Sequence, residues 1–333
     1  MKALLYMGPK QLDYQDVPDA VPQEGEELVC VSHVGICGSD MHAYLGHDER
    51  RPAPLILGHE AAGFIQGGEN DGKRVAINPL VSCLKCSVCL SGRENLCAKR
   101  QIISMFPREG AFAELVAIPR NNLVFIPDHV SLTKAALTEP IACGWHASRM
   151  VQESLDNSIT KPSALILGGG AIGVGAALSI KAQGVQNVTL LETNPVRRDY
   201  LARIREINVI GLNELTDNIM FDIVIDGVGF AGTREVATKY VLPGGVIAHI
   251  GLGDNEGGLD IRRMTLQEIT FIGTYTYTQK DFNQTAIAIF DDRLGELNWV
   301  EKRSLSEGAQ AFKDIYEGQC SAPKIILQPE ILP

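Results

Sequence analysis

The residues that most directly indicate chemistry are four cysteines within a short segment. Cys83, Cys86, Cys89 and Cys97 follow the spacing C-x2-C-x2-C-x7-C. Four thiolates at this spacing suit a closed, tetrahedral Zn²⁺ site with a structural role. An iron–sulfur cluster is the alternative, because it also accepts four cysteines. Zinc is favoured, since the segment lies among Gly, Pro and charged residues and no other feature of the sequence indicates electron transfer.

A second group of potential metal ligands lies nearer the N-terminus. Cys37 and His42 belong to the run CGSDMH, and His59 and Glu60 follow in LGHE. One thiolate, one imidazole and one carboxylate would make a three-ligand zinc site whose fourth position is open to water or substrate. A single Cys with a nearby His is by itself more often ordinary packing, so these residues alone leave the second site open.

A glycine-rich turn predicts a dinucleotide site. Gly168, Gly170 and Gly173 form G-x-G-x-x-G between the apolar run ALIL and a segment with helical apolar spacing. The first glycine permits a tight turn, the second lets the backbone approach a pyrophosphate, and the third lets helix and strand pack closely. The N-terminus of the helix then faces the phosphates with its partial positive charge.

The acidic residue expected of such a site is Glu192, nineteen residues beyond the last glycine. Its carboxylate would accept hydrogen bonds from the adenosine ribose and repel a 2′-phosphate, which favours NAD over NADP. Arg197 and Arg198 follow closely and weaken that preference.

The elements that must position these residues fall into two halves. The first ~130 residues are short apolar or alternating runs punctuated by Gly and Pro, which is typical of an irregular β-barrel or sandwich. From about Ser163 strands alternate with helical segments, which predicts an α/β fold with a doubly wound parallel sheet. The closing run KIILQP is a further strand that could return to the N-terminal half.

Composition bounds the function. The chain of 333 residues suits about two domains; it has 30 Lys and Arg against 40 Asp and Glu, a net charge of −10. This balance argues against nucleic-acid and anionic-membrane partners. The uncharged stretch 162–180 matches a membrane span only in length, because five of its residues are Gly. MKALLYMGPK lacks the features of a signal peptide, and clustered thiols suit a reducing, cytoplasmic setting.

Taken together, the motifs resemble those of the zinc-dependent medium-chain alcohol and polyol dehydrogenases. CGSDMH is similar to the family's first-ligand motif, LGHEAAG to its GHE motif, LGGGAIG to its cofactor turn and TEPIACGWHA to its third-ligand segment. The four-cysteine segment is similar to the family's structural-zinc lobe. The resemblance covers essentially the whole chain.

The resemblance implies a fold of two domains. A GroES-like irregular β-barrel catalytic domain would comprise 1–138 and 281–333 and carry the zinc lobe at 83–97. A Rossmann domain would comprise 139–280. The implied cofactors are two Zn²⁺ per chain and NAD, the partner is a small-molecule alcohol, and the assembly is a homodimer or homotetramer.

The resemblance also implies roles for individual residues. Cys37 and His59 would bind the catalytic zinc together with Glu139, which stands where the family's polyol branch has Glu and its alcohol branch has Cys. Glu60 would be a nearby carboxylate that enters the coordination sphere in some members, and Asp40 would accept the other ring N–H of His59. The remaining residues with implied roles are Ser39 and His42 in the proton relay, and Ala171, Ile172, Arg197 and Gly251 as further cofactor contacts.

We therefore expect a sorbitol dehydrogenase-like enzyme that transfers a hydride from a secondary alcohol of a polyol or sugar derivative to NAD. The alternatives are a threonine-type amino-alcohol dehydrogenase, a simple alcohol dehydrogenase, and a catalytically silent relative that only binds the cofactor. One departure from the family is the passage from Gly63 to Arg74, which is compressed and puts the local geometry of the barrel in doubt.

Overall fold

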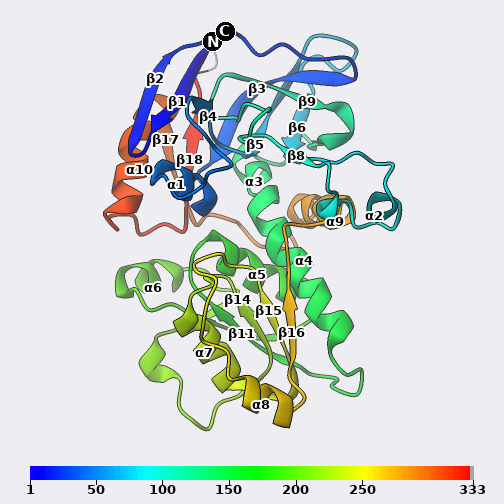
Figure 1. The fold of residues 1–333 in the computed structure, drawn as a ribbon, viewed down its shortest axis with the longest axis vertical. Helices are drawn as coiled ribbons and strands as arrows, with labels where there is room; N and C mark the ends of the chain where they lie inside the picture. Colours follow the sequence, from blue (N-terminus) through cyan, green and yellow to red (C-terminus); the bar gives the residue numbers. More distant parts are fainter. Residues whose placement is uncertain (331–333) are drawn as a thin grey trace.

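Two sheets of different construction organise the chain, and helix α4 (Thr138–Ser154) packs against elements of both (Figure 1). The computed structural model describes residues 1–330. The N-terminal half and the last strands form a mainly antiparallel barrel, and the middle of the chain forms a parallel α/β unit. Both halves of the predicted fold class are confirmed. The predicted domain limits stay a prediction, and 331–333 lie outside the described residues.

The barrel is built around β3, whose burial alternates along much of its length because one face packs against the apolar core. Its main sheet has the order β10-β6-β5-β3-β18-β17, with β9 also paired to β3, and a smaller sheet has the order β2-β1-β4. The strands of these two sheets are β1 (Lys2–Gly8), β2 (Gln11–Asp16), β3 (Glu26–Gly35), β4 (Leu55–Ile56), β5 (Glu60–Gln66), β6 (Arg74–Ile77), β9 (Leu115–Pro119), β10 (Leu123–Phe125), β17 (Val300–Ser304) and β18 (Lys324–Gln328).

The compressed passage from Gly63 to Arg74 forms an ordinary antiparallel hairpin between β5 and β6. Three glycines in its turn, Gly67, Gly68 and Gly72, have positive φ, so the chain reverses within few residues. At Gly63 itself a Cβ would overlap the backbone carbonyl of Cys30 on β3. The shortening therefore leaves the pairing of the barrel intact.

The last strand returns to the barrel. β18 pairs antiparallel with β3, through Ile326 and Gly35, and parallel with β17. The expectation that KIILQP pairs with the N-terminal half is confirmed. This return brings residues almost 300 positions apart in sequence into contact.

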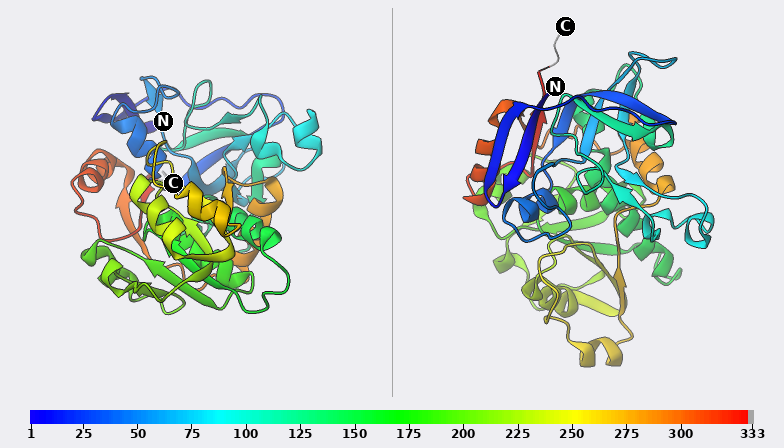
Figure 2. Two further views of the ribbon diagram at one scale, coloured as in Figure 1. Left: turned by 60° about the horizontal axis from the view of Figure 1, so that its bottom comes forward. Right: turned by 45° about the horizontal axis from the view of Figure 1, so that its top comes forward.

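The α/β unit contains a six-stranded sheet in the order β13-β12-β11-β14-β15-β16, with every pair parallel. The order reverses direction between β11 and β14, the place where ligands bind in such sheets. Helices cover both faces of the sheet (Figures 1 and 2). Two apolar clusters include side chains of the sheet and of these helices. Its strands are β11 (Ser163–Leu167), β12 (Asn187–Leu191), β13 (Asn208–Ile210), β14 (Phe221–Asp226), β15 (Val241–His249) and β16 (Thr270–Gly273).

The uncharged stretch 162–180 is strand β11, the glycine turn and most of helix α5. Across residues 1–330, no helix is both long enough and apolar enough to cross a membrane. The remaining elements are β7 (Leu80–Val81), β8 (Gln101–Ile102), α1 (Gly38–Tyr44), α2 (Ser87–Leu90), α3 (Leu132–Ala136), α5 (Ala171–Ala182), α6 (Pro195–Leu201), α7 (Ala231–Tyr240), α8 (Ile261–Leu266), α9 (Gln279–Phe290) and α10 (Gly308–Tyr316).

Candidate metal centres and cofactor cleft

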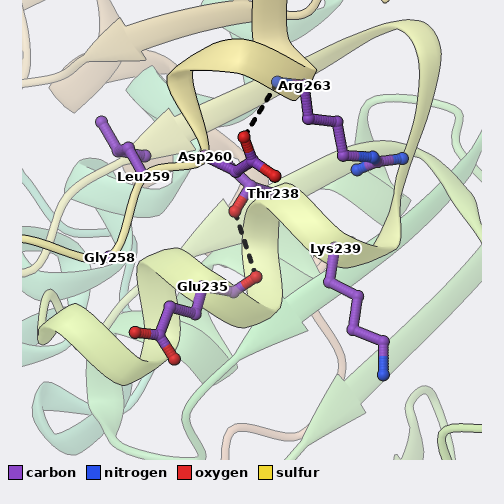
Figure 3. Close-up of a pocket in the computed structure, with 7 residues that line it drawn as sticks. All are labelled: Glu235, Thr238, Lys239, Gly258, Leu259, Asp260 and Arg263. Atoms are coloured by element: carbon purple, nitrogen blue, oxygen red, sulfur yellow. Dashed lines mark hydrogen bonds between the residues drawn. The ribbon is translucent and has the colours of Figure 1, made fainter.

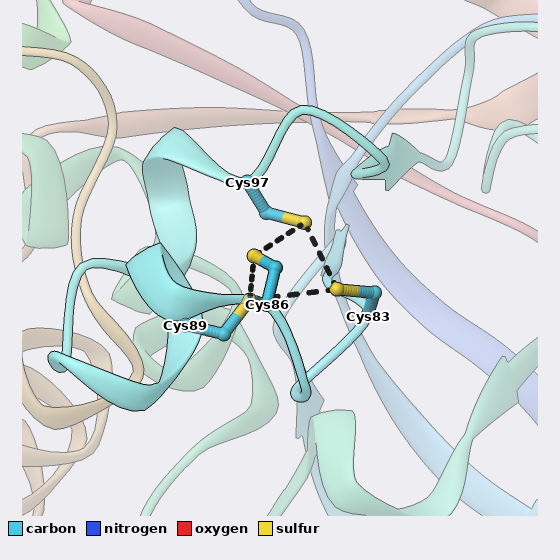
Figure 4. Close-up of side chains that lie close together, drawn as sticks. All are labelled: Cys83, Cys86, Cys89 and Cys97. Carbon is cyan, nitrogen blue, oxygen red and sulfur yellow. Dashed lines mark hydrogen bonds between the residues drawn. The ribbon is translucent and has the colours of Figure 1, made fainter.

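The four-cysteine lobe is a loop between the paired strands β7 and β8. Its thiols converge, with Sγ–Sγ separations of 3.5 to 3.9 Å along four edges of the cluster (Figure 4). Four sulfurs at ~2.3 Å from a tetrahedral zinc would stand about 3.8 Å apart. The quartet Cys83, Cys86, Cys89 and Cys97 therefore fits a closed tetrahedral site.

Backbone geometry prepares the lobe for metal. Leu84 and Gly92 have positive φ, which turns the chain tightly enough to bring the thiols together. Hydrogen bonds from the backbone N–H groups of Lys85 and Cys86 lower the pKa of Cys83 to about 6, whereas burial raises the pKa of the neighbouring Cys89 to about 12. The thiolate is the form that binds metal.

A second cluster lies inside the barrel, where ligand atoms of Cys37, His59 and Glu60 all fall within 4.8 Å of one another. Cys37 caps the N-terminus of α1, and His59 and Glu60 stand where β5 begins. His59 is 6% exposed and Glu60 is fully buried. Both Glu60 oxygens lie 2.6 Å from Nζ of Lys324, so the buried carboxylate is paired with a cation of the chain. A thiol, an imidazole and a carboxylate that converge in this way are a donor set that fits zinc.

The ring of His59 is oriented through its Nδ1 atom. Asp40 Oδ1 lies 3.4 Å from Nδ1, and Ser104 Oγ lies 3.3 Å from it. Asp40 is itself fixed by hydrogen bonds from the backbone N–H groups of Cys37 and Gly58. Contacts on Nδ1 leave Nε2 for a metal, which is the arrangement that the family resemblance implies for Asp40. Burial opposes a charge on His59, but Asp40 outweighs it and raises the pKa of the ring.

Lys324, on β18, reaches the same cluster. Its Nζ donates to Glu60 Oε1 at 2.6 Å and to the carbonyl of Ile36 at 2.7 Å. Both side chains of this ion pair are almost completely buried. The pair fixes Glu60 within the cluster, and only the return of β18 makes it possible.

Glu139 faces the cluster from α4 but belongs to a different contact. Its Oε1 accepts a hydrogen bond of 2.7 Å from the hydroxyl of Tyr277. Burial, together with the charge of Glu60, raises the pKa of Glu139 to about 7. The structure thus groups Glu60, rather than Glu139, with Cys37 and His59, and leaves Glu139 as a carboxylate beside them.

The two relay candidates lie on α1, immediately after Cys37. Ser39 is half-buried, and His42, one turn later, is exposed. Their order along α1 leads from the buried cluster towards solvent.

The glycine turn has the geometry that the motif predicts. Gly168 has φ +96°, and a Cβ at Gly173 would overlap the carbonyl oxygen of Gly168. Gly170 caps α5, and no atom lies within 4 Å of the position that its Cβ would occupy. That open space is the approach that a pyrophosphate needs.

Glu192 follows β12 and points back to the turn. Its Oε2 accepts from the backbone N–H of Gly169 at 2.9 Å, and its Oε1 accepts from that of Asn194 at 2.7 Å. Both bonds fix the carboxylate at the carboxyl edge of the parallel sheet, beside the predicted ribose position. Gly251 lies just beyond the end of β15, at the same edge of the sheet, where a Cβ would overlap the backbone of Val228.

One cavity joins the two predicted sites. It measures about 250 Å³ and has walls from the metal cluster, the start of α5, and β18 with the loop that precedes it. Arg197 also lines it, and its Nε is buried without a hydrogen-bond partner among the described residues. The predicted site residues among its lining are Cys37, Glu60, Gly170, Ala171, Ile172 and Arg197.

A larger pocket of about 420 Å³ lies between α7 and α8 and contains none of the predicted site residues (Figure 3). Two of its polar side chains serve local structure: Asp260 caps α8, and Thr238 donates to the carbonyl of Glu235. Size alone therefore does not identify the functional site.

Sequence reasoning missed three side chains of the metal centre: Ser104, Tyr277 and Lys324. The first two lie 45 and 138 positions from their partners and carry no local motif. Lys324 is the first residue of KIILQP, for which the sequence predicted only a strand. The one signal in the sequence for a buried role of Lys324 was a charged residue at the start of the apolar last strand.

Comparisons with known proteins agree with this geometry. Residues 23–128 match the family model of the alcohol dehydrogenase GroES-like domain, and 171–292 match that of the zinc-binding dehydrogenases. The chain is 31% identical over 297 residues to L-galactonate-5-dehydrogenase of Escherichia coli (strain K12), covering 85% of each chain. It is 30% identical over 296 residues to sorbitol dehydrogenase of Bacillus subtilis (strain 168), covering 83% of this chain and 82% of that one.

Among solved structures, galactitol-1-phosphate dehydrogenase from Escherichia coli superposes with a TM-score of 0.87 at 22% identity, covering 99% of this chain and 100% of that one. This likeness establishes the fold. Fold and site define a two-domain dehydrogenase with a metal centre next to a dinucleotide cleft. The chain belongs to the zinc-dependent medium-chain alcohol and polyol dehydrogenases. It is an oxidoreductase of the polyol branch whose cofactors are zinc and a nicotinamide dinucleotide.

Proposed function

We propose that this enzyme oxidises a secondary hydroxyl of a polyol or sugar acid with NAD, and that it holds two zinc ions per chain. The observation that carries the proposal is the shared cavity, because Cys37 and Glu60 lie in the same walls as Gly170 and Arg197. The relatives named above act on L-galactonate and sorbitol, which are both polyhydroxylated chains.

Cys37, His59 and Glu60 would hold the catalytic ion, and the four cysteines of the lobe would hold the other. The catalytic ion, when bound, lowers the pKa of a substrate hydroxyl. Glu139 is the alternative to Glu60 as third ligand, and its bond to Tyr277 supports a role beside the substrate instead.

The chain's own residues would then orient the substrate and move its proton. Ser39 would accept the proton of the hydroxyl while it passes its own toward the cofactor ribose, and His42, which is exposed, would pass a proton to water. Asp40 keeps Nε2 of His59 directed at the metal.

The cofactor would lie along the carboxyl edge of the parallel sheet. The backbone N–H groups at the start of α5 and the guanidinium of Arg197 face the pyrophosphate, and Glu192 faces the adenosine ribose. The fixed carboxylate of Glu192 supports NAD over NADP, because a 2′-phosphate there would meet a like charge.

The test is a panel of polyols, sugar acids, amino alcohols and simple alcohols, in which NADH formation by the metal-replete protein is followed. We expect turnover of polyols or sugar acids and a clear preference for NAD. Turnover confined to amino alcohols or simple alcohols would favour the corresponding alternative. No turnover of any secondary alcohol would favour a catalytically silent relative.

The same proposal covers assembly and location. A homodimer or homotetramer is supported by β16, the last strand on its side of the parallel sheet, and by the exposed apolar residues Ile261 and Leu266 on neighbouring α8. A cytoplasmic location is supported by the eight cysteines, all free thiols within the described residues. Light scattering on the purified protein tests the assembly, and a monomer at micromolar concentration would contradict it.

A further inference from the structure

A buried arginine lies in the segment that connects α1 to β4 and contacts residues beside the metal cluster. Arg51 is 2% exposed. A buried guanidinium is stable only when its N–H groups find acceptors and its charge is balanced. The charge is balanced by Asp48, whose Oδ2 lies 3.0 Å from Nη1.

The other acceptors of Arg51 belong to two serines of the site. Nη1 donates to the backbone carbonyl of Ser39 at 2.8 Å, and Nε donates to that of Ser104 at 2.9 Å. The two hydroxyls are at the limit of hydrogen-bond distance from Nη2, with Ser39 Oγ at 3.4 Å and Ser104 Oγ at 3.5 Å. The short bonds to the carbonyls therefore fix the backbone, and the longer contacts orient the hydroxyls.

Both serines lie at the metal centre. Ser39, the proposed relay residue, stands two positions after Cys37, and Ser104 Oγ lies 3.3 Å from Nδ1 of His59. Ser104 is fully buried and has φ +70°, a conformation that residues with a Cβ rarely adopt. Such a backbone persists only where neighbouring contacts hold it.

We propose that Arg51 is a positioning residue that fixes the Ser39 hydroxyl and, through Ser104, the ring of His59. The proposal rests on the proposed function for the role of Ser39. Only a planar guanidinium donates from separate nitrogens to two carbonyls at once, so lysine cannot replace it at this place. One side chain thereby aligns the proton relay with a metal ligand.

A merely structural arginine is available for comparison. Arg74, in the same barrel, donates from Nη1 to the carbonyls of Pro127 and Asp128. It also donates to the carbonyl of Val130 and makes no hydrogen bond to a site residue. Arg74→Lys therefore removes a similar set of backbone contacts without touching the centre.

The experiment compares Arg51→Lys, Ser104→Ala and Arg74→Lys. The first measurement is steady-state kinetics with the alcohol identified in the panel. The second is loss of the catalytic metal to a chelator, and the third is the visible spectrum of the cobalt-substituted protein. The spectrum of cobalt-loaded Cys37→Ala is subtracted to remove the contribution of the lobe.

For Arg51→Lys we expect kcat to fall about 10- to 100-fold, the range for residues that orient a metal ligand, with KM for NAD almost unchanged. The cobalt spectrum shifts, and metal is lost about tenfold faster. Ser104→Ala shifts the spectrum with a smaller fall in kcat, because Ser39 keeps its contact with Arg51. Arg74→Lys keeps wild-type values in all three measurements.

The proposal is overturned if Arg51→Lys keeps the wild-type kcat and cobalt spectrum, or if Arg74→Lys changes them equally. If Arg51→Lys fails to fold, the test rests on Ser104→Ala. A wild-type cobalt spectrum together with a wild-type rate of metal loss in Ser104→Ala would refute the role of Ser104. A wild-type protein without activity would refute the proposed function. The cobalt and chelator measurements would still test the positioning of His59.

Discussion

The two metal constellations of this enzyme lie in the same half of the molecule and are built in opposite ways. The lobe takes all its thiols from one loop of fifteen residues, 83–97, and three of the four are only half-buried. The proposed catalytic cluster takes its groups from separate segments, with Cys37 at the start of α1 and His59 and Glu60 at the start of β5. Its supporting contacts come from still further away, as the bond from Lys324 to Glu60 shows.

This difference indicates that the lobe stabilises the fold and that the other cluster takes part in the reaction. A local quartet of thiolates closes around its ion and leaves no position for a substrate. A cluster assembled from distant segments combines different types of ligand and faces a cavity, so a coordination position on its metal would be open to reactants. The lobe should therefore affect activity only through the structure that it holds.

The sharpest test of this contrast is Cys37→Ala. We expect zinc to fall from two ions to one per chain and turnover to fall at least about 1,000-fold, because the metal contributes several kcal/mol of transition-state stabilisation. The melting temperature should change little. Metal analysis, kinetics and thermal unfolding measure the three quantities. Cys30→Ala, a half-buried cysteine of β3 outside both sites, is the control and should retain both ions.

The complementary change is Cys86→Ser in the lobe. We expect loss of the lobe's ion, rapid proteolysis within 83–101, and a fall in turnover of about tenfold. The fall is indirect, since Asn95 of the lobe donates to the carbonyl of Tyr275 at 2.8 Å, two residues before the partner of Glu139. The magnitude is that expected of residues that orient a site from outside.

The control for this change is Ser91→Ala, in the same loop but not a metal ligand. Wild-type turnover in Cys86→Ser, after proven loss of the lobe's ion, would contradict a connection between the lobe and the centre.

The smallest effect on turnover is expected for Asp281→Asn. Asp281 is buried and bonds His146 at 2.8 Å and Arg149 at 2.8 Å, which ties α9 to α4, the helix of Glu139. Although burial opposes it, these hydrogen bonds lower the pKa of Asp281 well below its usual 3.8. Losing one partner of a buried ionic network costs about 3 kcal/mol of unfolding free energy.

The sign of the pH dependence follows from the lowered pKa. The unfolded carboxylate takes up its proton near pH 4 and the folded one only at lower pH. Asp281 therefore contributes full stability above pH 4 and loses it as the pH falls further. The free energy of unfolding can be measured with denaturant from pH 7 to pH 3. As the pH falls, it should decrease less steeply in Asp281→Asn than in the wild type. The control Asp292→Asn, an exposed partner of Lys134, should keep the wild-type slope.

The contrast between the two sites also explains what could be predicted from the sequence. The thiol quartet and the turn from Gly168 to Gly173 are encoded by residue type and spacing within one segment, so both were recognised. The catalytic cluster was predicted by resemblance. Which carboxylate joins Cys37 and His59 depends on how β5 and α4 pack, and the sequence could not decide between Glu60 and Glu139.

The supporting side chains were not predictable for the same reason. Ser104 is one polar residue in an irregular loop. Its position near His59 depends on a contact with Arg51, which lies 53 positions away. The short passage from Gly63 to Arg74 left the local geometry of the barrel in doubt. The structure shows that positive φ at its glycines makes the tight turn possible, and the length of the passage does not reveal this.

The position of β18 near the end of the sequence determines when the last residue of the metal centre is synthesised. Ribosomes synthesise Cys37 and His59 early, then the whole parallel sheet, and only afterwards Lys324, which neutralises Glu60. Until then Glu60 lacks its buried counter-charge, and the barrel has a gap between β3 and β17. The catalytic centre therefore gains its last buried contact only when almost all of this sequence has been synthesised.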